Sequence, residues 1–350
     1  MSGDVLLERL GGLGIVTLNR PQVLNTISLE MYREIDPALL AWREDPSVMA
    51  VLTRGAGDRA FCAGGDVVAV YRARSEPPGP DDYKALFFAE EYRLIRRVHR
   101  YPKPTIALVD GITMGGGVGV SVNGRFRVAT ERTVFAMPEV HIGLFPDVGA
   151  TRFLNRCPGR IGLYLALTGA RVGPADALYC GLATHFVPHE KVGALTEALT
   201  KDSGERAIET TLARFAGDPG AATLPPLKDA IDRCFAADSV GGIMARLVRE
   251  DGAWAKEAHD QMSRASPISM AITFRQVTEG AGMNVEAALT LEYRMTQHCM
   301  AGDDFYEGIR AVLVDKDRKP RWRHAARDKV SAAEIDSYFT PLGAGELSFA

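Results

Sequence analysis

The chain opens with two short apolar runs of the kind that form paired strands. The runs are Val5–Leu10 and Ile15–Leu18, and glycines stand around them at positions 11, 12 and 14. Apolar runs separated by a few glycine-containing residues are typical of a β-hairpin. The pattern therefore predicts a hairpin at the beginning of the fold.

A helical pattern with an internal proline comes next. Met31, Ile35 and Leu39 recur every four residues, as they would on one face of a helix. Proline has no N–H, and its ring crowds the preceding turn of a helix. We therefore expect Pro37 to bend or split this helix.

Strand and helix patterns continue to alternate as far as residue 123. Apolar runs predict strands at Val48–Thr53 and Thr105–Val109. Helical patterns cover Asp66–Arg74, Tyr83–Arg100 and Gly116–Asn123, with a break at Pro77-Pro78-Gly79-Pro80. Parallel strands joined by helices form α/β folds, so this part of the chain predicts an α/β core.

The pattern changes after about residue 200. Helical periodicity dominates from Glu205 to Val314, and the pairs Pro225-Pro226 and Ser266-Pro267 are expected to mark helix boundaries. We therefore predict an α/β core over residues 1–195 and a helical region over residues 196–350.

Composition and charge narrow the function classes. Apolar residues make up 46% of the 350 residues and charged residues 24%, which is typical of a globular protein and excludes disordered, collagenous and coiled-coil classes. Lys and Arg number 41 against 44 for Asp and Glu, so the formal charge is −3. This balance predicts no general attraction to nucleic acid or to an anionic membrane.

Cysteine usage and hydropathy bear on the compartment. The five cysteines are scattered and never spaced as C-x-x-C, so neither a disulfide framework nor a metal site is expected. The longest apolar stretch, Thr105–Val122, is interrupted by Asp110 and is too short to span a membrane. The N-terminal residues show no signal-peptide pattern. We expect a cytoplasmic protein.

Several sequence motifs are absent. The chain contains no G-x-G-x-x-G, no G-x-x-x-x-G-K-[ST], no G-x-S-x-G and no H-E-x-x-H. These patterns mark dinucleotide, phosphate, serine-nucleophile and zinc sites respectively. A dehydrogenase, a kinase, a serine thioesterase and a zinc hydrolase are therefore disfavoured.

Two glycine-rich turns each follow a predicted strand and lead into a predicted helix. One is Phe61–Asp66 (FCAGGD) and the other is Met114–Gly117 (MGGG). Backbone N–H groups at a helix N-terminus have no partner within the helix, and glycine permits close approach of a ligand. Two such turns could form an oxyanion hole, or the glycines could serve only tight turns and close packing.

A third segment places two carboxylates among apolar residues and prolines. Glu139 and Asp147 lie within Met137–Asp147 (MPEVHIGLFPD). Acidic side chains are rarely buried without partners, so these two are either solvated loop residues or functional groups. In an apolar pocket their pKa values could rise into a catalytically useful range.

The order of these three motifs resembles the crotonase (enoyl-CoA hydratase/isomerase) superfamily. The strings FCAGGD, DGITMGGGVG and PEVHIGLFPD carry the resemblance. Further strings resemble its 3-hydroxyisobutyryl-CoA hydrolase branch, among them SPISMAITFRQ, LEYRMTQHCM and DDFYEGIRAVLVDKDRKPRW in the helical half. The resemblance implies a crotonase-like (ββα) superhelical core with a C-terminal helical region.

The resemblance also implies roles for individual residues. The amides of Gly65 and Gly116 would form the oxyanion hole, and Glu139 and Asp147 would be the catalytic acids. Glu91 matches a substrate-contacting glutamate of the hydrolase branch. Lys316 falls where relatives often carry a basic residue near the coenzyme A phosphates.

One departure from the superfamily pattern concerns the hydratase reaction. Enoyl-CoA hydratases carry a second glutamate three residues after the middle glycine of GGG, and here that position is Gly119. Addition of water uses both glutamates, and general acid–base help is worth about 10²–10⁴-fold. Hydrolysis of a short 3-hydroxyacyl-CoA is therefore favoured, with a single-glutamate hydratase as the alternative and a binding scaffold as a third class.

The resemblance suggests a mechanism that leaves one step open. Glu139 either activates a water molecule or attacks the thioester to give an anhydride. Asp147 would orient the 3-hydroxyl of the substrate or move a proton. No metal or redox cofactor is expected, and coenzyme A enters as part of the substrate. Crotonase relatives commonly form trimers or hexamers, which suggests a homo-oligomer.

Overall fold

The computed structural model describes residues 3–75, 82–326 and 329–349. It divides into two compact units that interleave along the chain. Unit 1 comprises Met1–Asp66, Arg93–Phe135 and Val172–Thr223, and unit 2 comprises Val67–Tyr92, Ala136–Arg171 and Leu224–Ala350. None of these divisions falls at residues 195–196, so the compact units divide the chain differently from the expected core and helical region.

Unit 1 is built on a six-stranded sheet. Its strands, in spatial order, are β1 (Val5–Leu10), β2 (Leu13–Leu18), β3 (Ala50–Gly55), β5 (Thr105–Val109), β7 (Phe126–Ala129) and β9 (His185–Phe186). β1 and β2 pair antiparallel through a two-residue turn at Gly11 and Gly12, and the remaining neighbours pair parallel. The predicted hairpin and the predicted strand Thr105–Val109 are confirmed.

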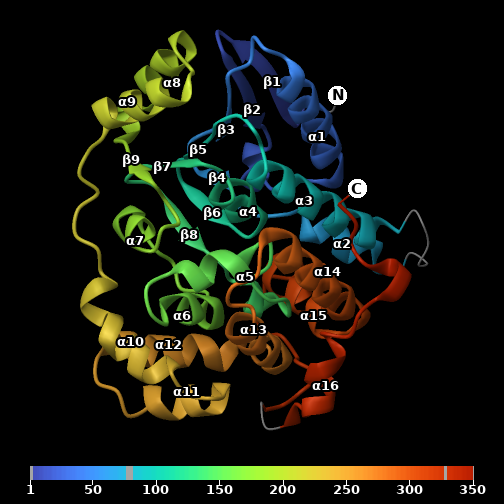
Figure 1. The fold of residues 1–350 in the computed structure, drawn as a ribbon. Coiled ribbons are helices and arrows are strands. Elements are labelled where there is room, and N and C mark those ends of the chain that lie inside the picture. Colours follow the sequence, from blue (N-terminus) through green and yellow to red (C-terminus); the bar gives the residue numbers. More distant parts are fainter. Residues whose placement is uncertain (1–2, 76–81, 327–328, 350) are drawn as a thin grey trace. The chain divides into compact units, whose positions relative to one another are not determined.

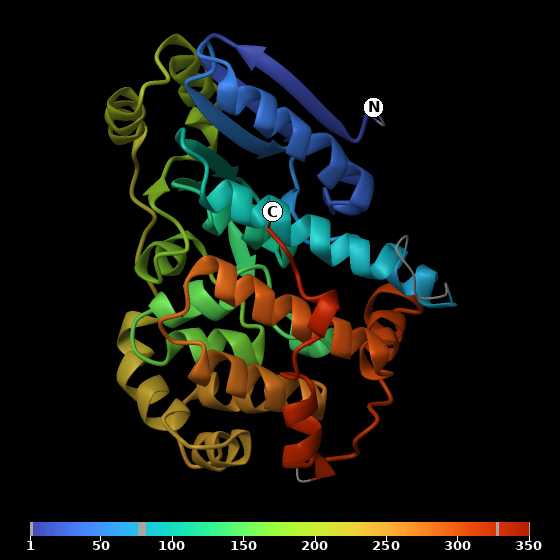
Figure 2. The same cartoon turned by 45° about the vertical axis from the view of Figure 1, so that its right-hand side comes forward.

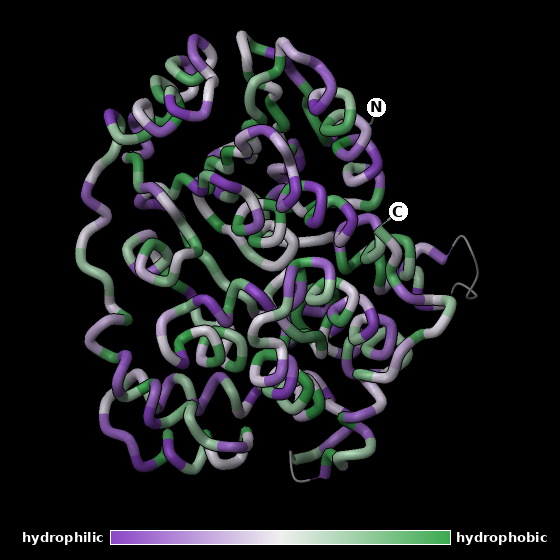
Figure 3. Tube along the Cα trace, in the orientation of Figure 1, coloured by the Kyte–Doolittle hydropathy of each residue, from purple (hydrophilic) through white to green (hydrophobic). Residues whose placement is uncertain are grey.

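One face of this sheet is covered by α8 (Val192–Lys201) and α9 (Glu205–Phe215). Alternate strand residues, such as Leu13 and Ile15 of β2, point to this side and pack with Leu195, Leu199 and Ile208. Figure 3 shows the polar and apolar positions that alternate along α8 and α9, as expected for helices with one buried face.

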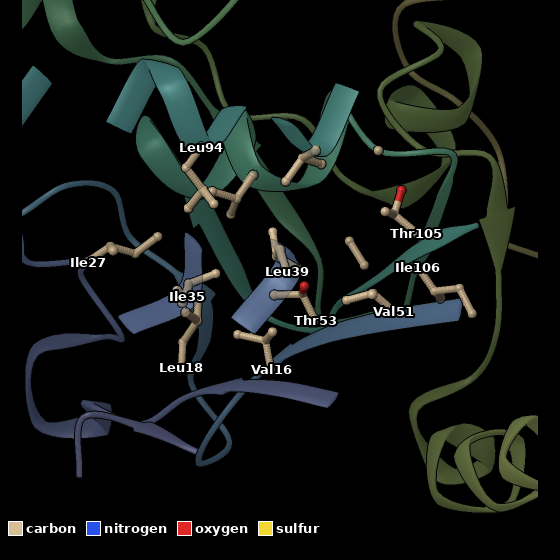
Figure 4. Close-up of a pocket in the computed structure, with 14 residues that line it drawn as sticks. Val16, Leu18, Ile27, Ile35, Leu39, Val51, Thr53, Leu94, Thr105 and Ile106 are labelled. Atoms are coloured by element: carbon tan, nitrogen blue, oxygen red, sulfur yellow. The ribbon is translucent and has the colours of Figure 1, made fainter. Parts of the chain in front are cut away.

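The opposite face of the sheet carries α1 (Leu29–Glu44), α4 (Gly116–Val122) and the second half of α3 (Tyr83–His99). In Figure 1, α1 lies beside β1, β2 and β3. Figure 4 shows the apolar layer between sheet and helices, which encloses a cavity of about 30 Å³ lined by Val16, Leu18, Val51 and their neighbours. A drug-sized ligand needs roughly 300 Å³ or more, so this cavity is a packing gap and not a substrate pocket.

The expectation that Pro37 would bend or split its helix is wrong. α1 runs without interruption from Leu29 to Glu44 with Pro37 inside it. Pro37 is exposed, and the buried residues Ile35, Leu39 and Trp42 line the other side of the helix. The missing hydrogen bond and the ring therefore face water, where the local backbone can adjust while the apolar face stays packed.

A second, smaller sheet supports the glycine-rich turns. It consists of β4 (Ala60–Cys62), β6 (Ile112–Met114) and β8 (Val134–Ala136) in that order. β4 and β6 pair parallel. Their C-terminal ends therefore lie at the same edge of this sheet, which brings together the turns that follow them.

Unit 2 consists mainly of helices. From the first half of the chain it takes α2 (Val67–Arg72), the first part of α3, and the short helices η3 (Glu139–Ile142), α5 (Ala150–Phe153), η4 (Leu154–Arg156) and α6 (Ile161–Thr168). Its later helices are α10 (Lys228–Phe235), α11 (Val240–Leu247), α12 (Ala253–Arg264), α13 (Pro267–Glu279), α14 (Val285–Ala301), α15 (Asp304–Ile309), the π-helix η7 (Arg310–Val314) and α16 (Ala332–Ser337). Figure 2 shows these later helices in gold to red.

The helix boundaries predicted in the second half are confirmed. A 3₁₀ helix, η6, begins at Pro225, and α13 begins at Pro267 with Ser266 as its N-cap. From residue 192 onward the described residues form helices and loops without strands. The predicted break at residues 77–80 lies outside the described residues. None of the described helices combines the length and the apolar character needed to cross a membrane.

Candidate active site

The first glycine-rich turn leaves the N–H of Gly65 directed away from its neighbours. Gly65 forms a parallel bridge with Ile27, in which Ile27 N–H donates to Gly64 O and Asp66 N–H donates to Ile27 O. In such a bridge the residues that flank Gly65 make the hydrogen bonds to Ile27, so the N–H of Gly65 itself points away from Ile27. Gly64 has φ +116°, which requires glycine.

The second turn places Gly116 at the first position of α4. The N-cap Gly115 has φ +48°, and the helix N-terminus leaves the N–H of Gly116 without an acceptor inside the helix. Glycine is also required one residue later, because a Cβ on Gly117 would lie 2.2 Å from the carbonyl oxygen of Cys62.

The two turns contact each other within unit 1. A Cβ on Gly64 would lie 3.4 Å from Met114 O and 3.8 Å from Gly116 N. This contact follows from the parallel pairing of β4 with β6. Two N–H groups in adjacent turns suit a single carbonyl oxygen, which is the arrangement an oxyanion hole needs.

In unit 2, η3 holds Glu139 in a buried position. Glu139 is 5% exposed, and its Oε2 has no hydrogen-bond partner among the described residues. Gly143 ends η3 with φ +73° and packs so closely on α15 that a Cβ there would lie 2.1 Å from Asp304 O. The contact with α15 therefore fixes η3, while the Glu139 carboxyl remains available to bind a proton or a ligand.

Asp147 lies eight residues later and is also buried, at 4% exposure. The Tyr92 hydroxyl, on α3, donates a hydrogen bond of 2.5 Å to Asp147 Oδ2. The next residue, Val148, has φ +56°, and Gly149 has φ +91°. A β-branched residue in this left-handed region costs about 1–3 kcal/mol, so the surroundings of Val148 must hold it there.

The buried acids of unit 2 interact electrostatically. Burial raises the pKa of Glu139 well above its ordinary value, and the charges of Asp147 and Glu91 raise it further. Burial raises the pKa of Asp147 to about 7, although the hydrogen bond from Tyr92 opposes the shift. Unit 2 therefore brings together three residues proposed from the sequence, Glu91, Glu139 and Asp147, and it raises the pKa values of Glu139 and Asp147, as is common for groups that transfer protons.

Sequence patterns did not single out two further polar residues at this site. Glu292 of α14 is fully buried, and its carboxylate accepts hydrogen bonds from the N–H groups of Gly149 (2.6 Å) and Thr151 (2.9 Å). Gln276 of α13 donates from Nε2 to Pro146 O (2.7 Å) and Thr151 Oγ1 (2.8 Å). Glu292 could have been found from the sequence, because it is a charged residue at a buried position of the helix pattern.

Lys316 is not connected to these acids by any ion pair between described residues. It is exposed, has φ +58°, and follows η7. Within the described part of the chain no ion pair joins Lys316 to Glu139 or Asp147. The neighbouring Arg310 is paired with Glu307, Asp315 and Asp317.

Two other polar residues near the motifs have structural contacts. His141 Nε2 lies 2.9 Å from Thr168 O, and burial lowers the pKa of the imidazole. Cys62 is fully buried, and its Sγ accepts a hydrogen bond from Gly64 N–H at 3.4 Å. Among the described residues, no group of three or more His, Cys, Asp or Glu side chains is arranged to hold a metal ion.

A family model described as enoyl-CoA hydratase/isomerase matches residues 13–339. The chain belongs to the enoyl-CoA hydratase/isomerase family. Relatives named "3-hydroxyisobutyryl-CoA hydrolase, mitochondrial" from Gallus gallus, Xenopus laevis and Homo sapiens are 45%, 46% and 42% identical to it. Each alignment covers 99% of this chain and 91% of the relative.

Solved structures of the family match over the whole chain. A carnitinyl-CoA dehydratase from Mycobacterium thermoresistibile has a TM-score of 0.93 and 42% identity, covering 99% of this chain and 98% of its own. An enoyl-CoA hydratase from Rhodobacter sphaeroides 2.4.1 has a TM-score of 0.92 and 41% identity, covering 99% and 100%. These matches confirm the predicted fold class, a crotonase-like α/β core with a helical C-terminal region.

Proposed function

We propose that this enzyme hydrolyses a short 3-hydroxyacyl-CoA thioester, with 3-hydroxyisobutyryl-CoA, an intermediate of valine degradation, as its main substrate. The products are the free 3-hydroxy acid and coenzyme A. The pairing of Glu139 with Asp147 in one buried cluster carries the proposal. The hydrolase names of relatives at 42–46% identity support the choice of substrate.

In the proposed reaction the thioester oxygen accepts hydrogen bonds from the N–H groups of Gly65 and Gly116. These donors stabilise the negative charge that develops when the carbonyl carbon becomes tetrahedral, which is usually the largest catalytic contribution. Glu139, in its ionised form, takes a proton from the attacking water, or attacks the carbonyl carbon itself to give an anhydride that water then hydrolyses. In either route the C–S bond breaks and coenzyme A leaves as its thiolate, which then takes up a proton. Asp147 exchanges a proton with the reacting groups, and Glu91 and Asp147 contact the 3-hydroxyl.

The hydratase alternative is weaker because of Gly119. This residue lies buried in α4, where its N–H donates to Gly115 O and its carbonyl accepts from Asn123 Nδ2. A hydratase of this family uses a second carboxylate at that position, and glycine supplies none. The acid that accompanies Glu139 is Asp147, on the segment that follows η3.

Two spectroscopic readouts separate the reactions. A thiol reagent detects coenzyme A released by hydrolysis, and loss of the enoyl-CoA absorbance detects hydration. We expect rapid thiol release from 3-hydroxyisobutyryl-CoA and 3-hydroxypropionyl-CoA. Isobutyryl-CoA, which lacks only the hydroxyl, should react much more slowly, because its binding leaves buried polar groups unpaired. Bleaching of an enoyl-CoA without thiol release would overturn the proposal.

The remaining parts of the proposal concern cofactors, compartment and assembly. The reaction as written needs no metal or redox cofactor, so turnover should survive dialysis against a chelator. We propose a cytoplasmic homo-oligomer, a trimer or hexamer, which fractionation and light scattering would test. Lys316 is proposed to bind the phosphates of coenzyme A from its exposed position.

A further inference from the structure

The segment from Pro146 to Thr151, which carries Asp147, is held from two helices of the C-terminal half. Glu292 of α14 accepts hydrogen bonds from two of its backbone N–H groups, those of Gly149 and Thr151. Gln276 of α13 donates to the carbonyl of Pro146 and to the hydroxyl of Thr151. These four hydrogen bonds lie on both sides of Asp147: they reach Pro146, one residue before it, and Gly149 and Thr151, two and four residues after it.

These contacts hold a backbone that would otherwise relax. Val148 occupies the left-handed region, which a β-branched residue enters only when its surroundings impose it. The carboxylate of Glu292 fixes the very next N–H, that of Gly149. A buried carboxyl group that accepts two N–H hydrogen bonds holds its partners directionally, because hydrogen bonds are stronger in a low-dielectric interior.

Glu292 sits where a structural residue would more simply be apolar. It is fully buried on α14, and no ion pair neutralises it among the described residues. Burial raises its pKa to about 8 against the effect of the two N–H donors, and Asp147 adds to the shift. A buried acid without a cation is costly, so its presence beside Asp147 calls for a role that an apolar side chain could not fill.

We propose that Glu292 is a positioning residue for the hydrolysis: by binding the N–H groups of Gly149 and Thr151 it fixes the Asp147 carboxyl in its reactive position. This inference rests on the proposed function, in which Asp147 takes part in catalysis. Glu292 itself does not contact the reacting atoms. Its effect reaches the reaction through the backbone on either side of Val148.

The first test replaces Glu292 by glutamine and by aspartate. In Glu292→Gln the amide NH₂ meets one of the two N–H donors, so one hydrogen bond is lost while the shape is kept. A displacement of about 1 Å at a catalytic group can cost on the order of 100-fold in rate, so kcat should fall by that order with a much smaller change in KM. Glu292→Asp keeps the carboxyl group but is one methylene shorter. It should lose kcat as well, and it serves as the test variant if the glutamine variant does not fold.

A double-mutant cycle separates positioning from loss of stability. If Glu292 acts through Asp147, adding Glu292→Gln to Asp147→Asn should lower the residual rate no further, because the group it positions is already disabled. The pH profile of kcat gives a second readout. If Glu292→Gln displaces Asp147 from the Tyr92 hydroxyl, whose hydrogen bond lowers the pKa of Asp147, the limb set by Asp147 should move to higher pH, which a loss of packing elsewhere would not do.

Asp176→Asn is the matched control. Asp176, on α7 (Pro174–Tyr179) in unit 1, is a buried acid that accepts hydrogen bonds from the N–H (2.8 Å) and hydroxyl (2.6 Å) of Thr223. The substitution removes the same kind of contact between distant parts of the chain. It should lower the unfolding midpoint and leave kcat and its pH profile unchanged.

Three combinations of these activities show whether Glu292 positions Asp147. Loss of kcat in Glu292→Gln, with no further loss in the double mutant, supports positioning through Asp147. If Asp147→Asn is inactive but Glu292→Gln retains kcat as the Asp176→Asn control does, Glu292 is only structural and the inference fails while the proposed function stands. If Asp147→Asn keeps wild-type turnover, the assigned role of Asp147 fails, and the inference fails with it.

Discussion

Replacing Asp147 by asparagine should remove activity and, at the same time, make the protein more resistant to unfolding as the pH rises. Burial raises the pKa of this carboxyl from an ordinary value of 3.8 to about 7. The folded state therefore binds the proton more tightly than the unfolded state does. The stability that comes from the protonated form is complete below pH 4 and is lost as the pH rises through 7.

The size of this effect follows from the shift of about three units. Each pKa unit corresponds to about 1.4 kcal/mol, so the full loss is about 4 kcal/mol, of which about 2–3 kcal/mol falls between pH 5 and pH 8. Asparagine does not ionise, and the Glu139 beside it would also ionise more easily without Asp147. The variant should therefore gain about 2–3 kcal/mol relative to the wild type over that range.

Urea unfolding of both proteins at pH 5 and pH 8, together with the thiol-release assay, measures both consequences. The comparison between two pH values cancels any constant effect of the new amide group, such as an unpaired N–H. The expected result is a variant with little turnover whose advantage in unfolding free energy is larger at pH 8. An advantage that is the same at both pH values would refute the view that Asp147 is buried with a raised pKa.

Three further substitutions test other parts of the structure. Tyr92→Phe removes the hydroxyl that favours the ionised form of Asp147, so the corresponding limb of the kcat–pH profile should move to higher pH; an unmoved limb would contradict the assignment. Gly117→Ala places a Cβ against the carbonyl oxygen of Cys62 and should lower the free energy of unfolding by about 1–3 kcal/mol or more. Gly193→Ala in α8, where a Cβ meets open space, is the control and should raise the free energy of unfolding by up to about 1 kcal/mol; thermal unfolding measures both. Lys316→Ala should raise KM about two- to fivefold at low salt and leave kcat unchanged; the same rise with a pantetheine thioester that lacks the coenzyme A phosphates would argue against phosphate binding.

Local sequence patterns predicted the elements that depend on local chemistry. The hairpin at Val5–Leu18 and the strand Thr105–Val109 have the alternation and glycine punctuation that their backbone requires, and both are confirmed. Pro37 was misjudged because its effect depends on which side of α1 faces the solvent, and the proline itself does not carry that information. The helix periodicity does carry it, since Ile35 and Leu39 define the buried side.

The candidate active-site residues also differ in whether local sequence patterns reveal them. Glu139 and Asp147 stood out because acids in an apolar, proline-rich segment are unusual. Tyr92 does not stand out in the sequence, although its hydroxyl donates to Asp147. Glu292 is more than 140 residues from the N–H groups it binds. Contacts at that separation are set by the packing of α5 against α14, which periodicity within one helix does not reveal.

The three buried acids Glu139, Asp147 and Glu292 share one physical constraint. None has a cation as ion-pair partner in the described part of the chain, so each must lower its cost by binding a proton or by accepting hydrogen bonds. Glu292 accepts two backbone N–H groups and Asp147 accepts the Tyr92 hydroxyl, whereas Glu139 Oε2 accepts none. Glu139 Oε2, which has no hydrogen-bond partner among the described residues, is open to bind a water molecule or the thioester. The ordering of hydrogen bonds within the cluster therefore favours Glu139 as the group that takes a proton from water or attacks the thioester, and Asp147 as the group held in place to assist it.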